Sequence, residues 1–224
     1  MSIAARLTPL GAPFVLALLL AVLYLLLPLL AVPQIVIVVV KGAVCPLLAL
    51  SIWRWRGGDA VAKLLSLALL FSAAGDVFLA LDRVRLFVPA LGSFLLAHLA
   101  YLVLFLRYRG RPALRLQLRQ WVLITLLLIY AAIMLAVLTP GLGKLLLPVY
   151  GYVAAIIAMG IAALALPGKP LVGLGAVSFI LSDSLIALDK FVEPIAWAGP
   201  AIWITYVAAQ VLILLGWRKQ AASG

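Results

Sequence analysis

Long apolar runs follow one another along this 224-residue chain, separated by short polar breaks. A bilayer core about 30 Å thick is crossed by a helix of roughly 20 residues, because a helix rises ~1.5 Å per residue. The pattern predicts eight membrane-spanning helices, near residues 10–28, 33–53, 60–81, 86–106, 120–138, 144–166, 171–189 and 195–217. The predicted fold class is an all-α polytopic membrane bundle, in which residues 1–224 form a single transmembrane domain.

Composition separates this chain from soluble proteins. Apolar residues make up 68% and charged residues 10% of it, whereas soluble domains carry about 25% charged residues. The net charge of +11 could suggest nucleic acid, but the basic residues are scattered over the short breaks rather than gathered on one face. No nucleic-acid partner is therefore expected. The single cysteine, Cys45, provides neither a disulfide framework nor a Cys-rich metal site, and no metal or cofactor is predicted.

The basic residues divide unevenly between the two sides that eight spans define. One side holds Arg6, Arg54, Arg56, Lys63, Arg107, Arg109, Arg111, Arg115, Arg119, Lys169, Arg218 and Lys219, and the other holds Arg83, Arg85, Lys144 and Lys190. The positive-inside rule predicts that the first side, with both termini, is cytoplasmic. We expect a bacterial inner membrane and a lipid-headgroup anchor in the loop of residues 107–119.

Two segments of the chain repeat a polar motif. FSAAGDVFLALDR, from Phe71, and SDSLIALDK, from Ser182, share a small residue, an aspartate, three mostly apolar residues, Ala-Leu-Asp and a basic residue. The copies lie four helices apart and so cross the membrane in the same direction, which indicates a parallel repeat. We predict repeat halves 1–110 and 111–224, related by an axis that would bring Asp76 and Asp183 face to face.

Three ionisable residues lie deep within the predicted spans: Lys41, Asp76 and Asp183. Such groups cost roughly 2.5 to 3.5 kcal/mol each on insertion scales, so that they are functional candidates with a partner nearby. Lys41 is too deep to snorkel easily, and we expect it to pair with the aspartates. Low dielectric and like-charge repulsion favour one shared proton between two carboxylates, which provides an acid beside a base. The alternative is an ion cluster that only fixes helix packing.

Other polar residues are candidates for the same site. His98, the fourth catalytic candidate beside Asp76, Asp183 and Lys41, shares a helix face with Phe94 and is either a proton carrier or a hydrogen-bonded packing residue. The serines next to the two aspartates can orient a carboxylate or close a helix contact. The candidate substrate-binding residues are Ser72, Tyr101, Tyr152, Ser182, Tyr206 and Gln210. Asp82, Asp189 and Glu193 are predicted to be solvated at the outer surface.

Several enzyme classes do not fit the sequence. One histidine cannot build a multi-histidine zinc site. The chain has no Gly-x-Ser-x-Gly nucleophile motif and no glycine-rich phosphate loop. A pair of intramembrane carboxylates with a lysine remains as the candidate chemistry.

The chain resembles the YhhN-type lysoplasmalogenases over nearly all its length. The stretches that carry the resemblance are Lys41, GDVFL from Gly75, GSFLLAHLAY from Gly92, Tyr152 to Met159, GAVSFILSD from Gly175, and Tyr206 to Gln210. One departure from the family is Gly42, which stands where proline is expected. We expect this glycine to loosen the helix there. The resemblance implies a membrane hydrolase that cleaves the vinyl ether bond of a lysophospholipid, the lysoplasmalogen, into a fatty aldehyde and a glycerophospho-alcohol.

Vinyl ether hydrolysis suits the residues found above. It needs a general acid and a carboxylate that stabilises positive charge and guides water, as in glycoside hydrolysis. Two other readings stay open. Parallel repeats and buried charges also occur in transporters and lipid-binding proteins, and the substrate could be another lysolipid. The sequence leaves the oligomeric state open.

Overall fold

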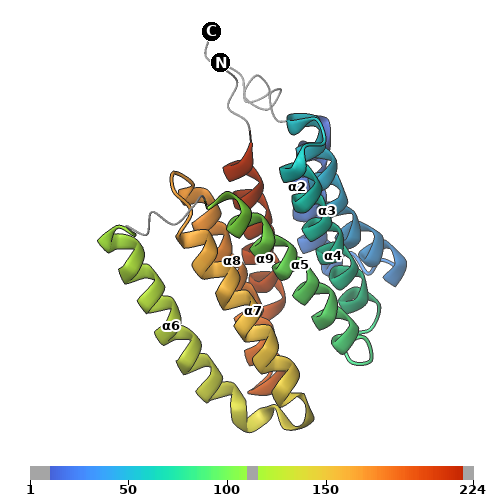
Figure 1. The fold of residues 1–224 in the computed structure, drawn as a ribbon. Coiled ribbons are helices and arrows are strands. Elements are labelled where there is room, and N and C mark those ends of the chain that lie inside the picture. The colour runs from blue at the N-terminus through green and yellow to red at the C-terminus, as the bar shows by residue number, and fades with distance from the viewer. Residues whose placement is uncertain (1–10, 110–115, 219–224) are drawn as a thin grey trace. The chain divides into compact units, whose positions relative to one another are not determined.

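The computed structural model describes residues 11–109 and 116–218. Within these ranges it contains helices and no strands, and eight helices are long and apolar enough to cross a membrane (Figure 1). Their α-helices are α2 (Ala12–Leu26), α3 (Gln34–Arg56), α4 (Ala60–Leu81), α5 (Phe87–Tyr108), α6 (Leu118–Leu138), α7 (Leu146–Leu164), α8 (Pro170–Phe191) and α9 (Ala198–Trp217). Short 3-10 turns lengthen the spans of α2, α6 and α7, so that the first span runs over Ala12–Leu29. The predicted fold class is confirmed, and the chain is an integral membrane protein.

The predicted spans agree with the observed helices to within a few residues. The largest differences are at helix ends: α3 continues to Arg56, where Gly57 follows in the left-handed conformation with φ of 67°. That conformation favours glycine and ends the helix with a standard C-terminal cap. Arg6, Arg111, Arg115 and Lys219, on which the predicted orientation partly depends, lie outside the described residues.

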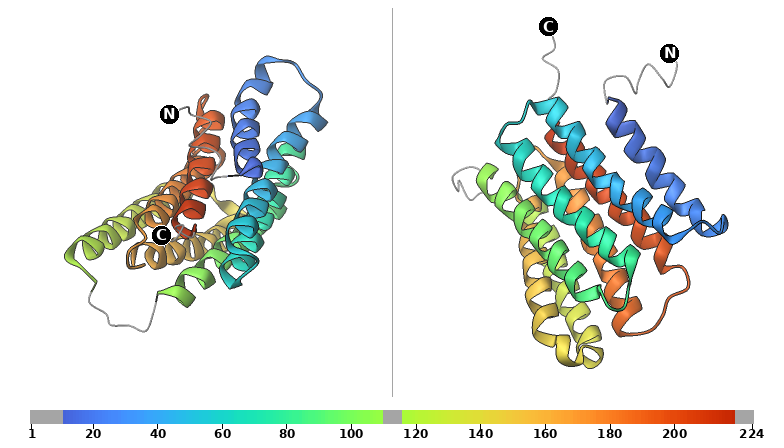
Figure 2. Two further views of the ribbon diagram at one scale, coloured as in Figure 1. Left: turned by 90° about the horizontal axis from the view of Figure 1, so that it is seen from above. Right: turned by 90° about the vertical axis from the view of Figure 1, so that its right-hand side faces the viewer.

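The chain divides into two compact units, residues 1–100 with 217–224 and residues 101–216. In the first unit, α3 packs along α4 and α2 packs along α3 (Figure 2). In the second unit, α7 packs against both α6 and α8, whereas α6 and α8 contact each other sparsely. The two predicted repeat halves stay a prediction.

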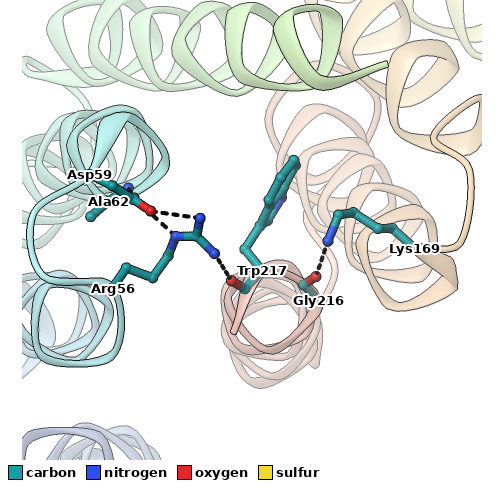
Figure 3. Close-up of polar contacts among 6 residues, drawn as sticks. All are labelled: Arg56, Asp59, Ala62, Lys169, Gly216 and Trp217. Carbon is teal, nitrogen blue, oxygen red and sulfur yellow. Dashed lines mark hydrogen bonds and ion pairs between the residues drawn. The ribbon is translucent and has the colours of Figure 1, made fainter. Parts of the chain in front are cut away.

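The start of α4 is fixed by Asp59. Its Oδ1 accepts a hydrogen bond from the backbone N–H of Ala62 at 2.9 Å, the usual N-terminal cap. Arg56 adds a hydrogen bond from Nε at 3.0 Å and an ion pair from Nη2 at 2.7 Å (Figure 3). The same aspartate therefore both caps α4 and ties it to the end of α3.

The C-terminal end of α9 receives cationic side chains. In the first unit, Arg56 Nη1 donates to the carbonyl oxygen of Trp217 at 2.9 Å (Figure 3). In the second unit, Lys169 Nζ donates to the carbonyl oxygen of Gly216, also at 2.9 Å. The last carbonyls of a helix have no intrahelical partner and carry partial negative charge, so that cations stabilise them.

We expect Asp59→Ala to lower the stability of the protein by about 1 kcal/mol, because it removes the cap of α4. The measurement is thermal unfolding of the purified protein in detergent. Asp59→Asn is the matched control, since its side-chain oxygen can still accept from Ala62. Equal losses in the two variants would mean that the ion pair with Arg56, and not the cap, carries the stabilisation.

Candidate active site

Asp76 lies on α4 and is buried, with 2% of its surface exposed. Lys41 Nζ is 3.7 Å from its Oδ1, and the Cys45 thiol donates to its Oδ2 at 4.0 Å. Lys41 and Cys45 are four residues apart on α3 and therefore share the helix face that meets α4. The predicted pairing of Lys41 with an aspartate is confirmed for Asp76. Sequence reasoning missed Cys45, although its i, i+4 spacing from Lys41 could have indicated it.

The ammonium of Lys41 has a second contact, which α2 provides. Its Nζ lies 5.6 Å from the centroid of the Tyr24 ring, within the range of a cation–π interaction. Only 13% of the Lys41 side chain is exposed. The ammonium thus lies between a carboxylate and an aromatic face, and both contacts stabilise its charge away from water.

Two glycines allow neighbouring helices to lie close to α4. A Cβ atom on Gly42 would be 2.7 Å from Val77 Cγ2, and one on Gly75 would be 2.6 Å from the Phe94 ring. Neither distance leaves room for a side chain unless the neighbour moves. Gly42 stands where proline is expected, and α3 runs unbroken through it. The proline inside this helix is Pro46. The glycines therefore set how tightly α3 and α5 pack beside Asp76.

His98 is fully buried on α5, one turn beyond Phe94. The prediction that it faces inward is confirmed by this burial. Ser72, one turn before Asp76 on α4, is also fully buried. Both side chains belong to the first unit, as do Lys41 and Asp76.

Asp183 lies on α8 and is half-buried. Tyr152 of α7 donates its hydroxyl to Asp183 Oδ2 at 2.5 Å. A hydrogen bond from a phenol to a carboxylate oxygen fixes the direction in which the carboxylate points. The sequence identified Tyr152 as a substrate-binding candidate, and the structure shows that it contacts the second aspartate.

The serines around Asp183 bond to α9. Ser182 Oγ donates to the carbonyl of Ile202 at 3.1 Å, and Ser178 Oγ donates to that of Thr205 at 2.7 Å. Of the two readings proposed for Ser182, the helix contact is the one for which the structure provides a hydrogen bond. Hydroxyl-to-carbonyl bonds of this kind hold membrane helices together. These two bonds therefore fix the rotation of α8 about its axis, and with it the direction in which Asp183 points.

The remaining candidates form a buried cluster in the second unit. Tyr101 donates its hydroxyl to Gln210 Oε1. Phe179 contacts both Tyr101 and Tyr206, with ring centroids 6.4 and 5.4 Å apart. Tyr101, Tyr206 and Gln210 are each at most 4% exposed. The predicted polar residues of α5 and α9 therefore lie together, around a phenylalanine that sequence reasoning did not identify.

The structure thus presents two aspartates, each with its own polar partners. Lys41 and Cys45 contact Asp76 in the first unit, and Tyr152 contacts Asp183 in the second. The predicted pairing of Asp76 with Asp183 joins residues of different units and stays a prediction.

Comparison with known proteins gives these residues a context. The human "Lysoplasmalogenase TMEM86B" is 35% identical, over 76% of this chain and 71% of its own length. "Lysoplasmalogenase" of Mycobacterium bovis is 36% identical, over 66% of this chain and 58% of its own length. The Bos taurus "Lysoplasmalogenase TMEM86A" is 38% identical, over 66% of this chain and 62% of its own length. The matches thus span between 58% and 71% of these relatives. No solved structure matches significantly. The family profile described as "YhhN family" matches residues 36–217, and the chain belongs to this family.

Proposed function

We propose that this protein is a membrane hydrolase that cleaves the vinyl ether bond of lysoplasmalogens, releasing a fatty aldehyde and a glycerophospho-alcohol. The observation that carries the proposal is the pair of intramembrane aspartates, each held by partners from neighbouring helices: Lys41 at Asp76 and Tyr152 at Asp183. The names of the relatives support the same activity. Ionisable groups at such depth are costly, which is why they favour a functional role.

The reaction begins with transfer of a proton to the β-carbon of the vinyl ether, which leaves positive charge on the carbon–oxygen unit. Water then adds to the resulting oxocarbenium ion, and the hemiacetal collapses to aldehyde and alcohol. One protonated carboxyl can supply the proton. A second, ionised carboxylate can stabilise the cation and accept a proton from water, the division of labour found in glycoside hydrolysis. We propose that Asp76 and Asp183 divide these two tasks.

The partners of the aspartates have supporting roles in this proposal. The Lys41 ammonium supplies a countercharge beside Asp76, with Tyr24 behind it. The Tyr152 hydroxyl orients the Asp183 carboxylate. His98 is proposed as a hydrogen-bond donor at the site. The proposed substrate contacts come from Ser72, Tyr101, Ser182, Tyr206 and Gln210.

The charge distribution supports an orientation in the membrane. We propose a bacterial inner membrane as the location, with both chain ends cytoplasmic, and the orientation is supported by the excess of basic residues on that side of the spans. In this orientation the C-terminal ends of α4 and α8 face the outer surface. Asp82, which ends α4, accepts hydrogen bonds from the backbone N–H groups of Arg85 and Val84, which lower its pKa below the ordinary value. It is thus suited to remain charged in water.

The specificity for one bond tests the proposal. We expect aldehyde release from an alkenyl lysolipid and negligible fatty acid from its acyl analogue. Ester cleavage builds negative charge on a carbonyl oxygen, which carboxylates oppose. The saturated alkyl ether should not react, because it has no double bond to protonate. The measurement is mass analysis of products from the three lipids, incubated with purified protein in detergent with and without EDTA.

Two results would contradict the carboxylate mechanism. Faster cleavage of the acyl lipid would indicate an ester hydrolase, and loss of aldehyde release with EDTA would indicate a metal-dependent reaction. Uptake of lysolipid into vesicles that contain the protein, without any product, would instead favour a transporter.

A further inference from the structure

An apolar groove lies on the second unit between α6, α7 and α8. Its volume is about 300 Å³, at the lower end of the ~300–1,000 Å³ typical of small-ligand sites. The lining includes Leu123, Leu126 and Tyr130 of α6, Leu164 of α7, and Ile180 and Leu181 of α8. The groove exists because α6 packs on α7 and contacts α8 only sparsely.

The chemistry of the lining limits what the groove can bind. Apart from Tyr130, the side chains that form it are aliphatic, and they belong to helices long and apolar enough to span the membrane. A polar or charged ligand would lose its hydration there without gaining hydrogen bonds. A hydrocarbon chain has no hydrogen bonds to lose when it enters. Between Leu123 and Tyr130, α6 rises about 10 Å, which suits a segment of one extended chain.

The groove lies close to Asp183 along both α7 and α8. Tyr152 and Gly160 are eight residues apart on α7, which is ~12 Å of helical rise. Tyr152 bonds to Asp183, and Gly160 packs against the groove residues Ile180 and Leu127. On α8, Ile180 precedes Asp183 by three residues, or ~4.5 Å of helical rise. The groove therefore begins close to the level of Asp183.

Resting on the proposed function, we propose that this groove binds the hydrocarbon chain of the lysolipid substrate. In a lysoplasmalogen the vinyl ether joins the glycerol to a single chain, so that the reacting carbon needs the head group on one side and the chain on the other. Asp183 lies about 12 Å by helical rise from Phe191, where α8 ends. The head group then lies toward the Phe191 end, and the chain extends from Asp183 toward the N-terminal end of α8.

Gly160 is in close contact with two residues that line the groove. A Cβ atom there would be 2.8 Å from Ile180 Cδ1 and 3.0 Å from Leu127 Cδ2, and both side chains line the groove. Either methyl group would have to move. The absence of a side chain at Gly160 thus lets Ile180 and Leu127 pack directly against the backbone of α7.

The first experiment compares chain lengths. Leu126 is 57% exposed in the groove wall, so Leu126→Trp adds bulk with little damage to the core. Leu128→Trp is the matched control on the same helix, at a position 49% exposed and outside the groove lining. We expect Leu126→Trp to raise KM for a long-chain alkenyl lysolipid roughly tenfold relative to a short-chain one, and Leu128→Trp to leave that ratio unchanged. An unchanged ratio in active Leu126→Trp would overturn the proposal.

A second experiment does not depend on turnover. A saturated alkyl-ether lysolipid with a photoreactive diazirine in its chain is irradiated with purified protein in detergent, and labelled peptides are identified by mass spectrometry. We expect labelling of the groove segments of α6 and α8, competed by excess unlabelled lysolipid and lost in Leu126→Trp but not in Leu128→Trp. Labelling of other segments would show that the lysolipid chain does not bind in the groove. Groove labelling that only ordinary phospholipid competes would show that the groove holds bilayer lipid, and either result would overturn the proposal.

The two experiments separate the groove from the proposed activity. Groove labelling without aldehyde release would contradict the vinyl ether hydrolase and leave the binding site standing. Aldehyde release without groove labelling would support the vinyl ether hydrolase and contradict the groove as the site of the hydrocarbon chain.

Discussion

Asp76→Asn and Asp183→Asn are each expected to lower kcat by roughly 10³-fold, the size of effect that loss of a general acid or base produces. Asparagine keeps the shape of aspartate but can neither donate a carboxylic proton nor carry negative charge. KM should change little, because the amide still fills the same space. The measurement is aldehyde release from an alkenyl lysolipid at saturating substrate.

The double variant tests whether the two residues act as one unit. Residues that act together in catalysis lose activity non-additively, so the double variant should be little slower than either single one. Asp82→Asn and Asp189→Asn are matched controls from the same repeated motif, six residues further on. Their side chains bond to the backbone N–H groups of Val84 and Ile195 outside the site, and near-normal rates are expected. Multiplicative losses for Asp76 and Asp183 would contradict a catalytic pair.

Lys41→Met is expected to destabilise the protein by about 3–5 kcal/mol, the cost of leaving a buried charge without its partner. The Asp76 side chain is 3% exposed, so water cannot replace the ammonium. Activity should fall as well, because Asp76 would no longer be held in its working state. The measurements are thermal unfolding in detergent and kcat.

A second substitution separates the catalytic role of Lys41 from its role in packing. Lys41→Met combined with Asp76→Asn removes both charges, so stability should return toward that of the normal protein while activity stays lost. Lys41→Arg keeps the charge and should lose less stability than Lys41→Met. If Lys41→Met were as stable as the normal protein, the 3.7 Å ion pair would not be what stabilises Asp76.

The spans could be predicted from the sequence because bilayer thickness dictates their length, and glycine and proline mark their ends. The contact of Lys41 with Asp76 could also be predicted, since a lysine so deep in a bilayer needs a partner. The contact of Tyr152 with Asp183 could not. It depends on how α7 and α8 are rotated about their axes, and the sequence does not indicate which neighbouring helix each polar residue of α8 faces.

The hydrogen-bond partner of Ser182 could not be predicted from the sequence for the same reason. Ser182 adjoins Asp183 in the sequence, yet successive residues of a helix point about 100° apart. Its hydroxyl therefore reaches Ile202 on α9 while Asp183 meets Tyr152 on α7. Spacing along one helix predicts which residues share a face, but the identity of the neighbouring helix is a tertiary property.

The close packing at Gly42 and Gly75 has a consequence for how this family can vary. Because a Cβ atom at either position would overlap Val77 or Phe94, substitutions at position 42 are coupled to position 77, and those at position 75 to position 94. A relative with a larger residue at position 42 is expected to have a smaller one at position 77, or a wider spacing of these helices. The neighbours of Asp76 should therefore change in pairs during evolution, even where the aspartate itself does not change.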